Sequence, residues 1–150
     1  MDLDDSVLSQ ADWVIGSVHF GQGQSRQQIT DRIVGAIENE FVSLIAHPTG
    51  RILNKRNPYD VDLDAVFAAA VANKTFMELN AAPKRLDLND VHLLAANAHG
   101  IPIVINTDAH APKSLGNLRF GIIQARRGCL TAGDVANTWS CKKMSDWLKS

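Results

Sequence analysis

The chain has 150 residues, enough for one compact domain with a sizeable buried core. Hydrophobic residues make up 45% and charged residues 21%, a composition typical of globular proteins that argues against long disordered tracts. The 15 basic and 16 acidic residues leave a formal charge of -1, which excludes the overall positive field of many nucleic-acid-binding proteins. Any contact with phosphate must therefore come from a local patch.

The sequence predicts a soluble, cytoplasmic protein with no membrane contact. Its first ten residues are acidic and polar, unlike a secretory signal, and no apolar run approaches the ~20 residues that span a bilayer. The two cysteines, Cys129 and Cys141, form neither a CxxC motif nor a disulfide framework, which fits a reducing compartment.

Short apolar runs alternate with segments of helical periodicity along the chain. The apolar runs predict strands covered on both faces, at residues 13–18, 41–46, 75–79 and 101–106. The helical segments lie at residues 25–39, 61–74, 88–100, 115–128 and 131–150. This alternation predicts an α/β fold with parallel strands and right-handed crossovers.

Caps and apolar stripes mark the helices. Ser25 and Asn89 are the expected N-caps of the first and third helices, and Thr131 or Asp134 of the last. The expected buried stripes are Ile29, Ile33 and Ile37 in the first helix, Val66, Phe67, Ala70 and Val71 in the second, and Val91, Leu94 and Ala95 in the third.

Polar side chains follow all four predicted strands at their carboxyl ends, where parallel α/β folds gather functional groups. In chain order they are His19; His47 and Arg51; Glu78, Asn80 and Arg85; and Asp108 and His110. Each has a structural alternative: His47 could begin a turn, Asp108 could cap a helix, and His110 could be a surface residue. Three of the five histidines at one edge favour a site instead. His92 and His99 lie in the third helix and are interpreted as structural.

Imidazole and carboxylate together suit Zn²⁺, Mn²⁺ or Fe²⁺ rather than Ca²⁺. A metal could supply hydroxide near neutral pH, and two metals could clamp a phosphoryl group. Arg51, Arg85, Arg126 and Arg127 are then candidates to bind phosphate oxygens. For Arg126 and Arg127 an equally good interpretation is a helix terminus that ends at Gly128.

The motifs "SVH", "AHPTGR", "ELNAAPKRLDL", "INTDAH" and "ARRG" resemble the C-terminal part of the PHP (polymerase and histidinol phosphatase) domain. The resemblance is strongest to the version in bacterial and archaeal family X DNA polymerases and covers nearly the whole chain. It implies that residues 1–150 form about four βα units of a distorted TIM-like (β/α)₇ barrel.

The resemblance also implies a cluster of up to three Mn²⁺ or Zn²⁺ ions and hydrolysis of phosphodiester bonds at DNA ends. His19 and His47 would ligate one metal, Asp108 a second and His110 a third. Glu78 and Asn80 match no ligand; Glu78 could be a hydrogen-bonded core residue, and Asn80 and Arg85 could line a substrate groove.

The family pattern also requires an HxH motif, a further Asp and His, and a bridging Glu, all before the "SVH" strand, and none is present. Four strands are also too few to close a barrel. We therefore expect a fragment with two open strand edges and an exposed apolar inner face, inactive alone, that needs the missing N-terminal half or self-association.

Three functions remain open at this point. The first is a 3′–5′ exonuclease-type phosphoesterase that acts on DNA 3′ ends in repair. The second is a phosphatase of a small phosphomonoester, such as histidinol phosphate. The third is a non-catalytic domain that supports a polymerase. No residue stands out as a general acid, since each strong candidate already has a ligand role.

Overall fold

The four predicted strands form one parallel sheet in the order β1-β2-β3-β4. The computed structural model describes residues 1–148. The strands are β1 (Val14–Gly16), β2 (Val42–Ile45), β3 (Phe76–Asn80) and β4 (Ile103–Asn106). The helices are α1 (Asp5–Leu8), α2 (Arg26–Ile37), α3 (Leu63–Asn73), α4 (Asp90–Ala98), α5 (Leu118–Arg127) and α6 (Cys141–Leu148). Short 3₁₀ turns span Pro112–Asn117, Ala132–Asp134 and Ala136–Thr138. The predicted α/β class and partial-barrel sheet are confirmed.

Local sequence signals explain where α2 and α4 begin. The Ser25 hydroxyl accepts a hydrogen bond from the Gln28 amide, and the Gln28 side chain accepts one from the Ser25 amide, which completes a capping box before α2. The Asn89 side chain accepts from the His92 amide at 2.8 Å and caps α4. Both predicted N-caps are confirmed.

The buried face of α4 differs from the prediction. Leu93 and Ala96 are buried, whereas Val91 and Leu94 are 69% and 51% exposed. Leu93 lies against the end of α5, where a Cβ added at Gly128 would come within 2.7 Å of its Cβ. Because α4 has apolar residues on more than one side, its apolar spacing does not determine which side is buried. Packing against neighbouring elements such as the end of α5 does. In α3, Val71 is likewise 48% exposed.

The C-terminal segment also differs from the prediction. Thr131 and Asp134 cap each other across the 3₁₀ turn Ala132–Asp134 instead of capping the last helix. Helix α6 begins at Cys141, and the Ser140 hydroxyl accepts a hydrogen bond from the Lys143 amide at 3.2 Å. Within the described part of the predicted helical stretch, residues 131–148, α6 accounts for 8 residues, and residues 149–150 lie outside the described residues.

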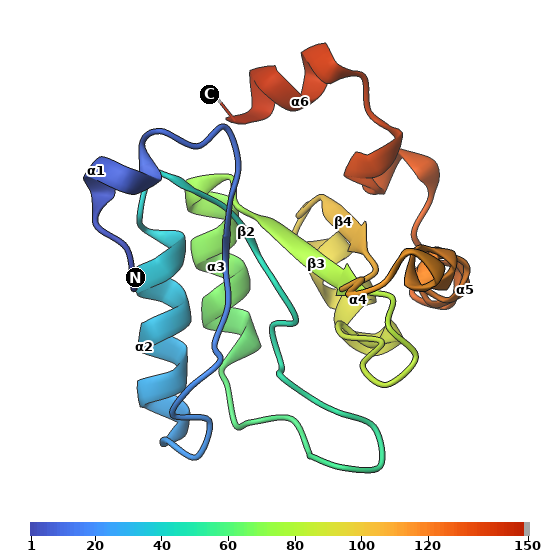
Figure 1. The fold of residues 1–150 in the computed structure, drawn as a ribbon, viewed down its shortest axis with the longest axis horizontal. Coiled ribbons are helices and arrows are strands. Elements are labelled where there is room, and N and C mark those ends of the chain that lie inside the picture. The colour runs from blue at the N-terminus through green and yellow to red at the C-terminus, as the bar shows by residue number, and fades with distance from the viewer. Residues whose placement is uncertain (149–150) are drawn as a thin grey trace.

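One face of the sheet packs on α2 to α5, and the other is covered by an aromatic cluster. Phe76 contacts Trp13, Trp139 and Trp147, with ring centroids 5.4–5.8 Å apart. Figure 1 shows α6, which carries Trp147, at the end of the molecule opposite the long loop that follows β2. The expected exposure of the inner apolar face is therefore wrong for the part around Phe76, which is fully buried.

The two edges of the sheet are not equivalent. At β4, the side-chain amide of Asn137 accepts from the Ile105 N–H at 2.7 Å and donates to the Ile105 carbonyl at 3.1 Å, as a neighbouring strand would. At the other edge, no strand within residues 1–148 pairs with β1 on its outer side, and Ile15 is 47% exposed. We expected two open edges; the structure has one.

Candidate metal centre

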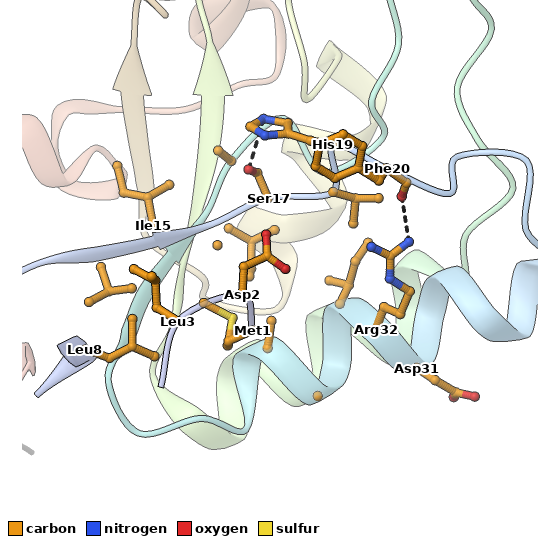
Figure 2. Close-up of a pocket in the computed structure, with 18 of the residues that line it drawn as sticks. Met1, Asp2, Leu3, Leu8, Ile15, Ser17, His19, Phe20, Asp31 and Arg32 are labelled. Atoms are coloured by element: carbon orange, nitrogen blue, oxygen red, sulfur yellow. Dashed lines mark hydrogen bonds between the residues drawn. The ribbon is translucent and has the colours of Figure 1, made fainter. Parts of the chain in front are cut away.

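His19 lies three residues beyond the end of β1. The neighbouring Val18 is buried, while His19 is exposed and its Nε2 is 3.1 Å from the Ser17 hydroxyl. Figure 2 shows this pair beside a cavity of about 580 Å³ that lies between β1, α2 and the N-terminal residues. His19 therefore reaches the carboxyl edge of the sheet from the strand whose outer side is open.

His47 follows β2 and is held in an uncommon backbone conformation. Its φ of +33° lies in the left-handed region, and its amide donates to Oε2 of Glu78 at 2.6 Å. The side chain is buried, and Nδ1 has no hydrogen-bond partner within residues 1–148. Burial, reinforced by the Arg85 guanidinium, lowers the pKa of His47 to about 4. The imidazole is therefore neutral at pH 7, as a metal ligand must be.

The two imidazoles lie close enough to share one metal ion. The ring centroids of His19 and His47 are 5.4 Å apart. Two imidazoles on one tetrahedral zinc, with Zn–N distances of about 2.0–2.1 Å, place their centroids roughly 5 Å apart. The Nδ1 of His47 is buried without a partner among residues 1–148, which is unusual because buried polar atoms normally have partners. This pair of residues fits the implied metal.

The end of β4 brings Asp108 and His110 together. Nδ1 of His110 lies 2.7 Å from the Asp108 carbonyl oxygen and 3.8 Å from the Asp108 carboxylate. The Asp108 carboxylate also accepts from Nε of Arg85 at 3.3 Å, so a protein cation already faces it. The four residues predicted as ligands thus form two pairs. Across residues 1–148, no three His, Cys, Asp or Glu side chains converge as a metal-binding group.

Glu78 connects the two strand ends that carry these pairs. Besides the His47 amide, its carboxylate accepts from the side-chain amides of Asn106 at 3.1 Å and Asn80 at 3.3 Å. Asn106 is two residues before Asp108. Burial raises the pKa of Glu78, and the three hydrogen bonds oppose that rise. The interpretation of Glu78 as a hydrogen-bonded core residue is confirmed.

Asp87 holds the turn at residues 47–50, which follows β2, and is not among the residues predicted from the sequence. Its carboxylate accepts from the Thr49 amide at 3.1 Å, and burial raises its pKa. Gly50, with a φ of +62°, closes the turn against Tyr59. A Cβ at Gly50 would lie 2.0 Å from the Tyr59 ring, which explains the glycine. Thr49 and Asp87 are 38 residues apart, so no local sequence pattern predicts their contact.

The predicted phosphate-binding residues fall in three places. Arg51 donates from Nε to the Arg85 carbonyl at 2.8 Å and also to the Leu86 carbonyl, so its guanidinium ties two loops together. In Arg85, the terminal Nη1 is buried and has no hydrogen-bond partner in the described chain. Asn80 is fully buried, and its side-chain oxygen accepts from the Ala82 amide.

Arg126 and Arg127 occupy the last turn of α5, which ends before Gly128. They lie roughly 12–14 Å along the helix axis from its first residue, Leu118. Arg127 pairs with Asp90 at the start of α4, with an Nη2–Oδ2 distance of 2.8 Å, and Arg126 is exposed. The alternative interpretation of a helix C-terminus is confirmed for both residues.

Comparison with known proteins gives the same family resemblance as the motifs. The chain is 41% identical over 149 residues to the DNA polymerase/3′-5′ exonuclease PolX of Bacillus subtilis, and the match covers 99% of this chain and 26% of that protein. It is 27% identical over 158 residues to a probable phosphatase of Thermoanaerobacter sp. (strain X514), with 99% of this chain and 62% of the relative covered. A probable phosphatase of Caldanaerobacter subterraneus is 28% identical over 119 residues. No family model matches the chain.

The chain therefore spans about a quarter of the polymerase and less than two thirds of the phosphatases that it matches. Both kinds of relative match 99% of it, so the segment that it corresponds to is common to both. Among the described residues, no helix is long and apolar enough to cross a membrane. The resemblance predicted from the motifs, to the C-terminal part of the PHP domain of family X DNA polymerases, is thereby confirmed.

Proposed function

We propose that this chain is the C-terminal portion of a metal-dependent phosphoesterase domain that acts on DNA 3′ ends in the cytoplasm, as a 3′–5′ exonuclease does in repair. The observation that carries the proposal is the buried, neutral imidazole of His47, whose Nδ1 has no hydrogen-bond partner within residues 1–148 and whose ring centroid lies 5.4 Å from that of His19. The PolX relative, named for a 3′–5′ exonuclease, supports the choice of reaction.

In this proposal each side chain has a distinct task. His19 and His47 hold one Mn²⁺ or Zn²⁺ ion, Asp108 helps to hold a second and His110 a third. Bound metal would supply hydroxide near neutral pH and neutralise charge on the phosphoryl oxygens. Arg85, which pairs with Asp108 at 3.3 Å, would bind a phosphate oxygen next to it. Glu78 and Asp87 would keep the His47 turn in place.

We propose further that the chain alone is close to inactive. Its predicted ligands lie in two pairs, and a stable multi-metal site needs more ligands than a pair provides. The open outer side of β1 and the cavity beside it are where a further parallel strand would add the rest (Figure 2). The remaining half of the barrel, or a second copy of this chain, would supply that strand.

A second candidate is hydrolysis of a small phosphomonoester. The probable phosphatases that match 99% of the chain favour it, because the same metal chemistry serves both substrates. The two candidates differ in whether the enzyme needs contacts beyond one phosphate group.

The test uses this chain alone and the chain joined to the preceding part of the B. subtilis relative. Mn²⁺-dependent release of nucleotides from a 3′-labelled single strand is measured with each, together with metal content by mass spectrometry. We expect the full set of metal ions and nucleotide release only in the joined protein, and loss of nucleotide release on Asp108→Ala. A joined protein that binds metal and cleaves p-nitrophenyl phosphate but leaves DNA intact would establish the phosphatase. One that is folded and holds no metal would refute both.

A further inference from the structure

Two loops beside the predicted metal centre carry a concentration of positive charge. We call residues 51–58 and 81–86, which follow β2 and β3, the basic loops. They contain Arg51, Lys55, Arg56, Lys84 and Arg85, five of the 15 Lys and Arg residues of the chain, and no Asp or Glu. In a chain with a net charge of -1, this local excess stands out.

The basic loops are fastened to each other and to the sheet. The Leu53 amide donates to the Lys84 carbonyl at 2.7 Å, and Arg51 donates to the Arg85 carbonyl. Within the first loop, Ile52 and Arg56 form an antiparallel bridge. Figure 1 shows both loops away from α6, at the carboxyl end of the sheet. They therefore form one ordered surface rather than two independent segments.

The five cations divide into three that are engaged and two that are not. Arg51 and Arg56 donate to backbone carbonyls, and Arg85 pairs with Asp108. Lys55 and Lys84 are exposed, and neither ammonium group has an ion-pair partner within residues 1–148. The nearest acids along the chain are occupied: Asp60 and Asp62 face Arg26, and Asp87 is buried.

Arg85 is where this surface meets the metal centre. Its side chain pairs with Asp108 at 3.3 Å and helps to lower the pKa of His47. Its backbone carbonyl accepts a hydrogen bond from Arg51, and Lys84 is the preceding residue. The predicted ligands and the basic loops thus meet at Arg85, and the loops themselves contain no Asp or Glu.

We infer that the basic loops are a binding surface for the phosphate backbone of single-stranded DNA, on which Lys55 and Lys84 contact phosphates beyond the one that reacts. A small phosphomonoester has a single phosphate, which Arg85 beside Asp108 would meet, and would leave both lysines without a task. A polynucleotide has phosphates at regular spacing, and lysine contacts to them position the strand without reading its sequence. This inference rests on the proposed function and selects DNA over a small substrate.

The test measures binding of a fluorescein-labelled single-stranded oligonucleotide to the chain by anisotropy, in EDTA, at several salt concentrations. Lys55→Ala/Lys84→Ala removes two charges from the basic loops. Lys74→Ala/Lys142→Ala removes two charges from exposed lysines at the opposite end of the sheet and is the matched control. Lys55→Arg/Lys84→Arg keeps the charge, and circular dichroism verifies the fold of each variant.

Each phosphate contact to a single strand contributes about 0.7 to the slope of log affinity against log salt. We therefore expect the Lys55/Lys84 alanine pair to reduce the slope by about 1.4 and the affinity about 25-fold at 0.1 M salt. The control pair and the arginine pair should bind like the parent chain. An equal loss in the control pair, an unchanged slope in the Lys55/Lys84 pair, or no DNA binding by the parent chain would overturn the inference.

A second readout separates this inference from the proposed function. The same variants are made in the joined protein and assayed for Mn²⁺-dependent hydrolysis of p-nitrophenyl phosphate. The inference predicts that Lys55→Ala/Lys84→Ala lowers DNA cleavage and leaves the small-substrate rate unchanged. Normal hydrolysis of both substrates by the variant overturns the basic-loop surface and leaves the phosphoesterase intact. Salt-dependent DNA binding through the two lysines without any hydrolysis would support the surface and refute the proposed reaction.

Discussion

The role of Glu78 as the connection between β2 and β4 makes a quantitative prediction. Glu78→Ala would leave three donors without this acceptor: the buried His47 amide, the buried side-chain amide of Asn80 and the half-buried side-chain amide of Asn106. One unsatisfied buried donor costs about 1–3 kcal/mol. Since the longest of the three bonds is weak and some relaxation will occur, we expect a total loss of about 3–5 kcal/mol in the free energy of unfolding.

Glu78→Gln is the matched control, because glutamine has the same shape and retains one acceptor oxygen. That oxygen can face the His47 amide, and the Asn106 amide can invert to accept from the new NH₂ group. We expect a loss of only about 1 kcal/mol. Urea unfolding followed by tryptophan fluorescence at pH 7 measures both values. Equal losses for Glu78→Ala and Glu78→Gln would refute the proposed connection, because loss of the negative charge, which both variants share, rather than loss of hydrogen bonds would then explain the effect.

The pH dependence of stability, compared between the parent chain and Glu78→Gln, gives an independent check. Burial raises the pKa of Glu78 above its usual 4.5, so between 4.5 and the raised value the folded chain binds more protons than the unfolded chain. The stability contributed by the protonated carboxyl is complete below pH 4.5 and is lost as the pH rises through the raised value. Glu78→Gln has no such titration. Parent stability should therefore fall relative to Glu78→Gln as the pH rises from 4.5 to 7, and parallel curves would contradict this reasoning.

Three further predictions concern other parts of the fold. Because the pKa of His47 is lowered from 6.5 to about 4, the unfolded chain binds more protons in that interval, and stability should fall as the pH drops through it, by up to about 3 kcal/mol. His47→Asn should flatten that slope in urea unfolding, and a slope that persists would count against it. Asn137→Ala removes two hydrogen bonds from the edge of β4. We expect a loss of about 2 kcal/mol in the free energy of unfolding and self-association in analytical sedimentation. A variant that stays a stable monomer would show that this edge needs no cover. Gly50→Ala places a Cβ 2.0 Å from the Tyr59 ring at positive φ and should lower the melting temperature strongly, whereas Gly35→Ala, with no atom within 4 Å, should raise it slightly.

The sequence predicts most of the sheet because its strands are short and apolar and because helices with recognisable N-caps separate them. The four strands, the caps Ser25 and Asn89 and the carboxyl-edge placement of His19 and His47 follow from local patterns. The buried side of α4 does not, because Leu93 and Leu94 are adjacent and only the packing of α5 distinguishes them.

The site was less predictable than the fold, because its key contacts join residues far apart in the chain. The Asp87 contact to Thr49 and the cover of β4 by Asn137 have sequence separations of 38 and 32 residues. Arg51 shows the same limit: its positive charge suggests a phosphate ligand, while its geometry makes it a brace between two loops. A residue type indicates what a side chain could bind, and only its neighbours decide what it does bind.

The central claim, that the strand ends hold metal, is tested most directly by calorimetric titration of Zn²⁺ into the chain. His47 and His92 each have a buried Nδ1 without a hydrogen-bond partner in the described chain, and only His47 lies next to another imidazole at the strand ends. The account predicts that His47→Asn abolishes zinc binding and that His92→Asn, a matched loss of one imidazole from α4, leaves it unchanged. Zinc binding that survives His47→Asn, or that is lost equally in both variants, would contradict a metal centre at the strand ends.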